Sequence, residues 1–208
     1  SNPFRAFGYN NPEEYNINLM SIAAHKLYGP KGIGALYISS GTKLEKIITG
    51  GYQERNRRAG TENIPAIAGF AKATELAYSI IHAESQREKE LRDYMETLIL
   101  EQIPSVTING NLNNRLSNIS SLTIDNAMAE SILFNLDLRG ICISAGSACS
   151  SGTLNPSHVL LALGHDTKMA KSSIRVSLGK FNTKEDIDEF VKQLELVVEQ
   201  ERNLSDLY

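Results

Sequence analysis

The sequence predicts an α/β protein with two regions joined by a long helix. Residues 1–64 alternate apolar runs with glycine-rich loops, residues 65–102 repeat apolar side chains at helical spacing, and residues 104–208 combine short apolar runs with amphipathic segments. A chain of 208 residues suits one large domain or two small ones. We therefore predict one domain over residues 1–103, which includes the linking helix, and a small α+β domain over residues 104–208.

The first region is expected to contain two strands and the long helix. Residues 16–22 and 32–38 are apolar enough for buried strands, and a turn with three glycines and Pro30 separates them. Pro65 suits the first turn of a helix, and Pro104 ends it. The stretch 84–90 is entirely polar, so we expect one helix over 65–102 that is exposed at its middle. Two helices with a break near residue 84 are the alternative.

The second region shows the signals of a mixed unit. We expect strands at 106–109, 118–124, 141–145 and 174–178, and helices at 127–138 and 156–163. Thr183 and Asp186 predict a capping box at the start of a final helix. That helix has one apolar face, formed by Ile187, Phe190, Val191, Leu194, Val197 and Val198. Cys142, within an apolar run, is expected to be a small buried hydrophobic residue.

Composition excludes several classes of function. The net charge of −3 gives no reason to expect nucleic acid. No apolar run reaches about 18 residues, so no membrane span is expected. Cys142 and Cys149 are the only cysteines, and their spacing matches no zinc motif, so no metal site is expected. A free Cys149 suits a reducing cytoplasm.

Two segments carry residues suited to covalent chemistry. Cys149 lies in a run of small residues from Ser144 to Gly152, where no bulky side chain can cover its thiol. A surface turn with an incidental cysteine is the alternative. His25 and Lys26 follow the first predicted strand, and a lysine held over a pocket can form a Schiff base. An ordinary basic turn is the alternative there.

Four motifs together resemble the cysteine desulfurases of the class V aminotransferase group. In chain order they are His25 to Gly32, Gly50 to Asn63, Gly146 to Gly152 and Ser172 to Gly179. They look like the family's cofactor-lysine motif, its glycine- and arginine-rich loop, its cysteine loop and its carboxylate-binding motif. The continuation of the cysteine loop over residues 154–160 resembles the branch that serves iron–sulfur cluster assembly.

The resemblance implies a fold and a cofactor. Members of the family are about twice this length, so the chain is expected to be the C-terminal half of a pyridoxal 5'-phosphate-dependent transferase fold. Residues 1–103 would be part of the large cofactor-binding domain with its linking helix. Residues 104–208 would be the small domain that carries the cysteine loop.

The resemblance also implies a role for individual residues. Lys26 would be the Schiff-base lysine, and His25 and Thr61 would bind the cofactor phosphate, Thr61 across a dimer interface. Cys149 would accept sulfur as a persulfide, and Arg175 would pair with the substrate carboxylate. The alternatives are a loop threonine with a local backbone bond for Thr61 and an arginine paired with a nearby acid for Arg175. His158 and His165 are expected to be structural.

The implied activity converts L-cysteine to L-alanine and leaves a persulfide for a sulfur acceptor or an iron–sulfur scaffold protein. A homodimer, or association with a missing N-terminal half, would complete the site. One alternative is a non-catalytic remnant without the cofactor, because Arg5 and Ala23 stand where the family has Gln and a phosphate-binding Ser. Asn2 aligns with the family's Asp, but this alternative rests on Arg5 and Ala23 alone. A sulfur carrier that uses Cys149 alone is the other.

Overall fold

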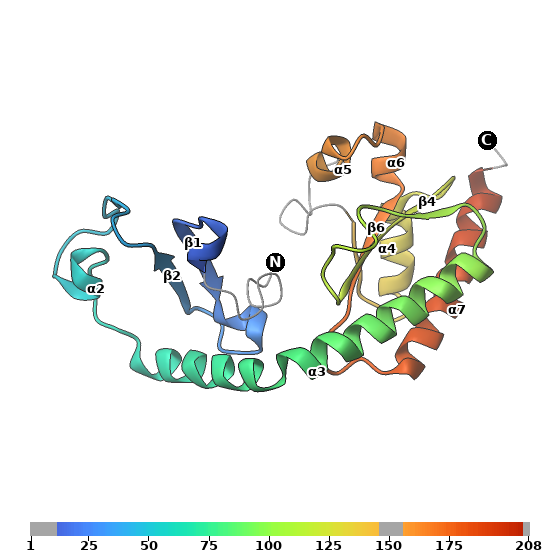
Figure 1. Ribbon diagram of the computed structural model, residues 1–208. Coiled ribbons are helices and arrows are strands. Elements are labelled where there is room, and N and C mark those ends of the chain that lie inside the picture. The colour runs from blue at the N-terminus through green and yellow to red at the C-terminus, as the bar shows by residue number, and fades with distance from the viewer. Residues whose placement is uncertain (1–11, 146–155, 206–208) are drawn as a thin grey trace. The chain divides into compact units, whose positions relative to one another are not determined.

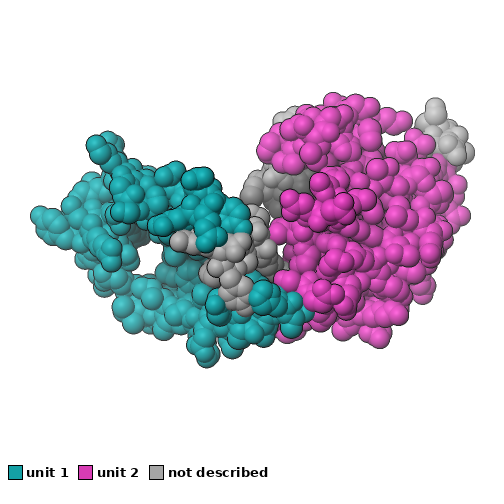
Figure 2. Space-filling view, in the orientation of Figure 1, with its two compact units in different colours: residues 1–83 teal, residues 84–208 magenta. Residues whose placement is uncertain are grey.

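The computed structural model describes residues 12–145 and 156–205. The chain divides into two compact units, Ser1–Ala83 and Glu84–Tyr208, which we describe separately (Figure 2). The boundary falls within α3 (Ile64–Gln102), so this helix contributes residues to both units. The prediction of one continuous helix over 65–102 is therefore confirmed, and the alternative of two helices is wrong.

Unit 1 is built around a two-stranded hairpin. Strands β1 (Leu19–Ala23) and β2 (Gly34–Ile38) pair antiparallel, with Leu19 opposite Ile38 and Ala23 opposite Gly34 (Figure 1). The short helices are η1 (Pro12–Tyr15), η2 (Ala24–Leu27) and α2 (Gln53–Asn56). Both predicted strands exist, but the expectation that they are buried is wrong. Leu19 is 45% exposed and Leu36 is 48% exposed, because the described residues of unit 1 provide too little chain to cover both faces of the hairpin.

The turn between the two strands packs on the first half of α3. Ala24 and Leu27 of η2 are buried. A Cβ atom at Gly29 would lie 3.0 Å from the Cβ of Ala73 on α3, and one at Gly69 of α3 would lie 2.7 Å from Cγ of Pro30. Small residues on both sides therefore let the turn and the helix approach closely, which fixes the position of η2 within unit 1.

Unit 2 contains an antiparallel four-stranded sheet in the order β3-β4-β6-β5. The strands are β3 (Val106–Ile108), β4 (Ile119–Ile124), β5 (Ser144–Ala145) and β6 (Ser173–Ser177). The helices are α4 (Ala129–Asp137), α5 (His158–Ala162), α6 (Thr167–Lys171) and α7 (Lys184–Ser205), beside the second half of α3. All predicted elements of this region are present with shifted ends, and α6 was not predicted.

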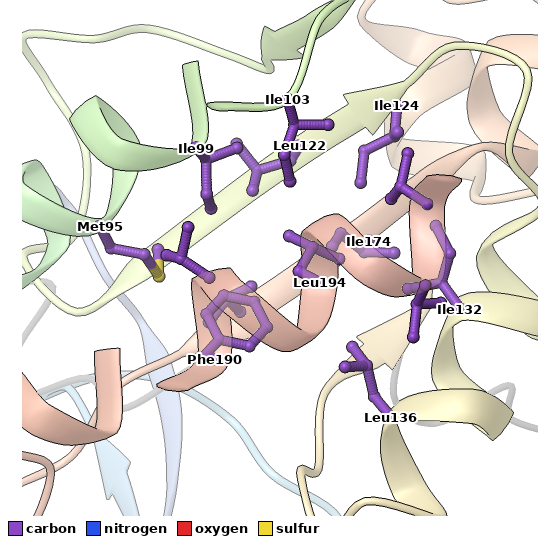
Figure 3. Close-up of a cluster of buried hydrophobic side chains, with 14 of the residues drawn as sticks. Met95, Ile99, Ile103, Leu122, Ile124, Ile132, Leu136, Ile174, Phe190 and Leu194 are labelled. Atoms are coloured by element: carbon purple, nitrogen blue, oxygen red, sulfur yellow. The ribbon is translucent and has the colours of Figure 1, made fainter. Parts of the chain in front are cut away.

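The core of unit 2 lies between one face of the sheet and helices α3, α4 and α7 (Figure 3). Alternate residues of the central strands, such as Leu122, Ile124 and Ile174, project to this face and are buried. The six residues predicted for the apolar face of α7 are all buried, which confirms that prediction. The capping box is also present. Thr183 N donates to Asp186 Oδ2 at 3.0 Å, and Asp186 N donates to Thr183 Oγ1 at 3.3 Å.

The prediction for Cys142 is wrong, since this cysteine is exposed. Strand β5 contains only Ser144 and Ala145 of the predicted strand 141–145. In the extended segment before it, Ile141 and Ile143 pack against the core. The side chain between them therefore projects the other way, so the cysteine faces solvent.

Helices that could cross a membrane are absent from the part of the chain described by the structure. Groups of three or more histidine, cysteine, aspartate or glutamate side chains arranged to hold a metal ion are likewise absent from residues 12–145 and 156–205.

Candidate functional site

His25 and Lys26 lie on η2, directly after strand β1 in unit 1. Both side chains are exposed, while their neighbours Ala24 and Leu27 are buried. The turn closes through Gly29 N, which donates to Ala24 O at 3.0 Å, and through Tyr28, which adopts a left-handed backbone conformation. The buried residues anchor this turn, so its two basic side chains face outward where a ligand can reach them.

Thr61 lies on a separate loop of unit 1, three residues before α3 begins. Its side chain is exposed, as are those of Arg55, Arg57 and Arg58. Ala59 is buried and anchors the loop, and Gly60 N donates to Gln53 Oε1 at 3.2 Å. The predicted phosphate-binding hydroxyl of Thr61 is therefore carried by a loop that also presents Arg57 and Arg58, and Arg55 lies just before it on α2.

Arg175 lies at the middle of β6 in unit 2, on the face of the sheet that points away from the core. Its side chain is half-buried, and its Nε is buried with no hydrogen-bond acceptor among the described residues. Within the same part of the chain no carboxylate forms an ion pair with it, so the alternative of an arginine paired with a nearby acid finds no partner there. The donor is therefore placed to receive an anion from outside these residues.

The strands beside Arg175 bring polar residues that sequence reasoning missed. Ser121 on β4 and Ser144 on β5 are each directly opposite Arg175 in the antiparallel register. Asn109, at the end of β3, donates through Nδ2 to Ser121 Oγ at 3.2 Å. Part of the signal was present in the sequence, because polar residues alternate with apolar ones along β6, which indicates one polar face of the sheet.

The polar stretch 84–90 of α3 forms hydrogen bonds with the turn that follows β6, the strand that carries Arg175. Arg87 donates to Asn182 O at 2.7 Å and to Gly179 O at 3.0 Å, in the turn that follows β6. Glu88 is completely buried, and Ser117 Oγ donates to it at 3.4 Å. The expectation of an exposed middle for this helix is therefore wrong for these residues, because the turn after β6 and the loop before β4 cover them.

Some predicted residues lie outside the described part of the chain. Cys149 and the whole segment 146–155 belong to this group, as do Asn2 and Arg5. The segment follows directly after Ala145, which pairs with Ile174 next to Arg175. His158 is exposed at the start of α5, and His165 is half-buried with a buried Nδ1 that has no partner within residues 12–145 and 156–205.

Comparison with known proteins places these observations in a family. Residues 10–190 match the family described as Aminotransferase class-V. The chain is 47% identical over 195 residues to "Cysteine desulfurase IscS" of Dictyoglomus turgidum, and the match covers 94% of this chain and 50% of the relative.

Solved structures give the same result. The NifS-like protein from Rickettsia africae superposes with a TM-score of 0.84 at 35% identity, covering 95% of this chain and 52% of that one. A structure titled "SspA in complex with cysteine" gives a TM-score of 0.61 at 31% identity, covering 86% of this chain and 50% of that one. The chain thus spans about half the length of the relatives it matches. From the match over most of its length, the chain belongs to the aminotransferase class-V family, and within it is similar to cysteine desulfurases.

Proposed function

We propose that this chain is part of a cysteine desulfurase in which Arg175 binds the carboxylate of L-cysteine. The observation that supports this most directly is the buried Nε of Arg175, which has no acceptor among the described residues. A guanidinium keeps its charge at all ordinary pH values, and its fork matches a carboxylate. Buried donors in proteins are nearly always paired, so a donor left open favours a ligand anion.

Unit 1 supplies side chains of the types that pyridoxal 5'-phosphate requires. The amine of Lys26, the imidazole of His25 and the hydroxyl of Thr61 are all exposed. Lys26 would hold the cofactor through its amine, while His25 and Thr61 would donate hydrogen bonds to its phosphate. When bound, the cofactor supplies an electron sink that labilises bonds of the amino acid.

Cys149 would take the sulfur atom from L-cysteine. The carbon–sulfur bond of the substrate breaks, a sulfur–sulfur bond forms on Cys149, and L-alanine leaves with the thiol proton on its carbon, so no external oxidant is needed. The attacking species is the thiolate. The persulfide would then pass to a sulfur acceptor or an iron–sulfur scaffold protein in the cytoplasm. A homodimer, or association with an N-terminal half, would complete the site.

The cofactor assignment is tested by visible absorption of the purified chain with added pyridoxal 5'-phosphate. The wild-type chain is expected to develop an absorption band that Lys26→Ala abolishes, because the amine of Lys26 is the proposed attachment point. Lys31→Ala is the matched control, since Lys31 is an exposed lysine in the same turn. A band that survives in Lys26→Ala, or disappears equally in Lys31→Ala, contradicts the assignment.

The second candidate is a remnant that has lost the cofactor. Ala23 is the residue before η2, and its methyl group makes no capping hydrogen bond there. A serine at this position would add a hydroxyl donor for a phosphate. The absence of any Lys26-dependent band would favour this candidate.

A further inference from the structure

The outer face of the sheet in unit 2 surrounds Arg175 with hydroxyl groups. Ser121 and Ser144 are directly opposite Arg175 on the two neighbouring strands. Directly opposite residues of an antiparallel pair project to the same face. Arg175 therefore lies between Ser121 and Ser144 in the sheet, and its side chain projects to the same face as theirs.

Ser121 and Arg175 form the kind of antiparallel pair in which the two side chains lie closer together. Ile124 N donates to Ser172 O, and Leu178 N donates to Asn118 O, so these positions belong to the hydrogen-bonded pairs between β4 and β6. Since the two kinds of pair alternate, Ser121 and Arg175 form a non-hydrogen-bonded pair, in which side chains lie closer together.

A second pair of the same kind shows how close the side chains on this face are. Thr123 and Ser173 are also directly opposite each other, and their hydroxyl oxygens are 2.7 Å apart. A ligand group held by Arg175 therefore lies within reach of the hydroxyl on the opposite strand.

Asn109 determines whether the hydroxyl of Ser121 accepts or donates a hydrogen bond. Thr123 Oγ1 donates to Asn109 Oδ1 at 2.9 Å, which turns the amide nitrogen toward Ser121. Asn109 is only 9% exposed, so this arrangement is shielded from water. Ser121 Oγ accepts from Asn109 Nδ2 and, among the described residues, donates no hydrogen bond of its own. Its proton therefore remains available to an acceptor beside Arg175.

We propose that Ser121, oriented by Asn109, donates a second hydrogen bond to the carboxylate that Arg175 binds. The inference rests on the proposed function, since it concerns the same carboxylate. A carboxylate offers about four lone-pair directions, of which a bidentate guanidinium uses two. A hydroxyl donor on the neighbouring strand can use a third, so that the pair Arg175 and Ser121 selects the α-carboxylate of a small amino acid.

The test uses the full 208-residue chain and nuclear magnetic resonance of the arginine Nε–H groups. The Arg175 signal is identified by its loss in Arg175→Gln, and its shift on titration with L-alanine shows that the ligand reaches this guanidinium. Isothermal titration calorimetry gives the dissociation constant for each variant, including Arg175→Gln, which lacks the signal. Because a hydrogen bond to a charged group is lost, Ser121→Ala is expected to weaken L-alanine binding roughly 10-fold. Ethylamine, which lacks the carboxylate, should not shift the signal, and inorganic phosphate should bind more weakly than L-alanine.

Three variants separate a direct contact from a general disturbance of the sheet. Ser121→Thr keeps a hydroxyl and should restore most of the affinity, while Asn109→Ala should weaken binding without a change in the ligand preference. Thr107→Ala is the matched control, since Thr107 is an exposed hydroxyl residue of β3 opposite Thr123 and two strands from Arg175. It should leave binding unchanged.

The outcomes distinguish this inference from the proposed function. If Arg175→Gln abolishes L-alanine binding and Ser121→Ala does not weaken it, the role of Ser121 is wrong and that of Arg175 stands. If Arg175→Gln binds L-alanine as the wild type does, the carboxylate role of Arg175 is wrong as well. A wild-type chain whose Arg175 signal does not respond to L-alanine, or that prefers phosphate, contradicts both.

Discussion

Arg115 and Glu96 form a largely buried ion pair in unit 2. Arg115 donates two hydrogen bonds to Glu96 of α3, at 2.7 and 2.6 Å, and Ser120 Oγ donates to the same carboxylate at 2.6 Å. The side chain of Glu96 is only 6% exposed and that of Arg115 is 18% exposed. The hydrogen bonds to Glu96 raise the pKa of Arg115 further, against the opposing effect of burial. Loss of Arg115 would leave the buried Glu96 without an ion partner, and loss of Glu96 would leave Arg115 with only the more distant Asp93, at 3.9 Å.

We expect Glu96→Gln to lower the free energy of unfolding by about 3 kcal/mol, because it removes one charge of a buried pair. Urea unfolding followed by circular dichroism measures this change. The matched control is Glu189→Gln in α7, where Lys192 lies 3.8 Å away and both side chains are more than half exposed. An exposed pair contributes roughly 0–1 kcal/mol, so the control should be close to wild type. Equal losses in the two variants would contradict the assignment of Glu96 and Arg115 as a buried pair.

Single residues could be predicted only where a local pattern decides their surroundings. The residues of the α7 face follow from helical spacing, and all of them are buried. Glu96 and Arg115 are 19 positions apart, and only the fold brings them together. Cys142 was predicted wrongly because its run is apolar throughout, and composition alone does not say which alternate side chain faces the core. Ser121 was missed because β4 has two adjacent serines, Ser120 and Ser121, and the sequence does not say which of them faces the core.

Among the elements, the start of α7 is defined by its capping box. Thr183 and Asp186 satisfy each other's backbone N–H groups, which the first turn of a helix otherwise leaves without partners. We expect Thr183→Ala to lower the free energy of unfolding by about 1 kcal/mol, measured by urea unfolding. Thr97→Ala is the control, since Thr97 is exposed inside α3 and donates to Asp93 O at 2.9 Å. Because alanine favours helix interiors, this control should be neutral or slightly stabilising. An unchanged stability in Thr183→Ala would show that the cap does not stabilise α7.

Elements with strong periodicity or caps could be predicted, whereas short ones could not. The long helix α3 was predicted because its apolar spacing runs from Ile67 to Ile99 between two prolines. Helix α6 has only five residues, too few for a periodic signal, and its start is fixed by Asp166, whose side chain accepts from Met169 N at 2.8 Å. The burial of the polar stretch in α3 was unpredictable, because the groups that cover it come from Gly179 and Asn182, about 90 residues later.

At the scale of the whole molecule, the described residues of unit 1 bury too little apolar surface for a stable domain. Its buried apolar residues among those described are Ala24, Leu27, Ala59 and Ala73. Large apolar side chains are instead exposed on its strands, its loops and its part of α3. They are Tyr15, Leu19, Tyr28, Leu36, Leu44, Ile47, Ile48, Tyr52, Ile64, Ile67, Leu76, Tyr78 and Ile80. Monomeric proteins rarely expose so much apolar surface, and a two-stranded hairpin also leaves strand edges open to pairing.

We therefore expect the chain to self-associate at micromolar concentration, which sedimentation velocity measures. Replacing Ile47 and Tyr52, which are 96% and 82% exposed, by lysine should raise the monomer fraction, because both changes remove apolar surface and add charge. Leu112→Lys is the control, since Leu112 is an exposed apolar residue of unit 2, where a complete core already exists. That variant should associate as the wild type does. A wild-type chain that sediments as a monomer would show that unit 1 buries its apolar surface within a single copy. An equal effect of Leu112→Lys would place the contact on unit 2 instead.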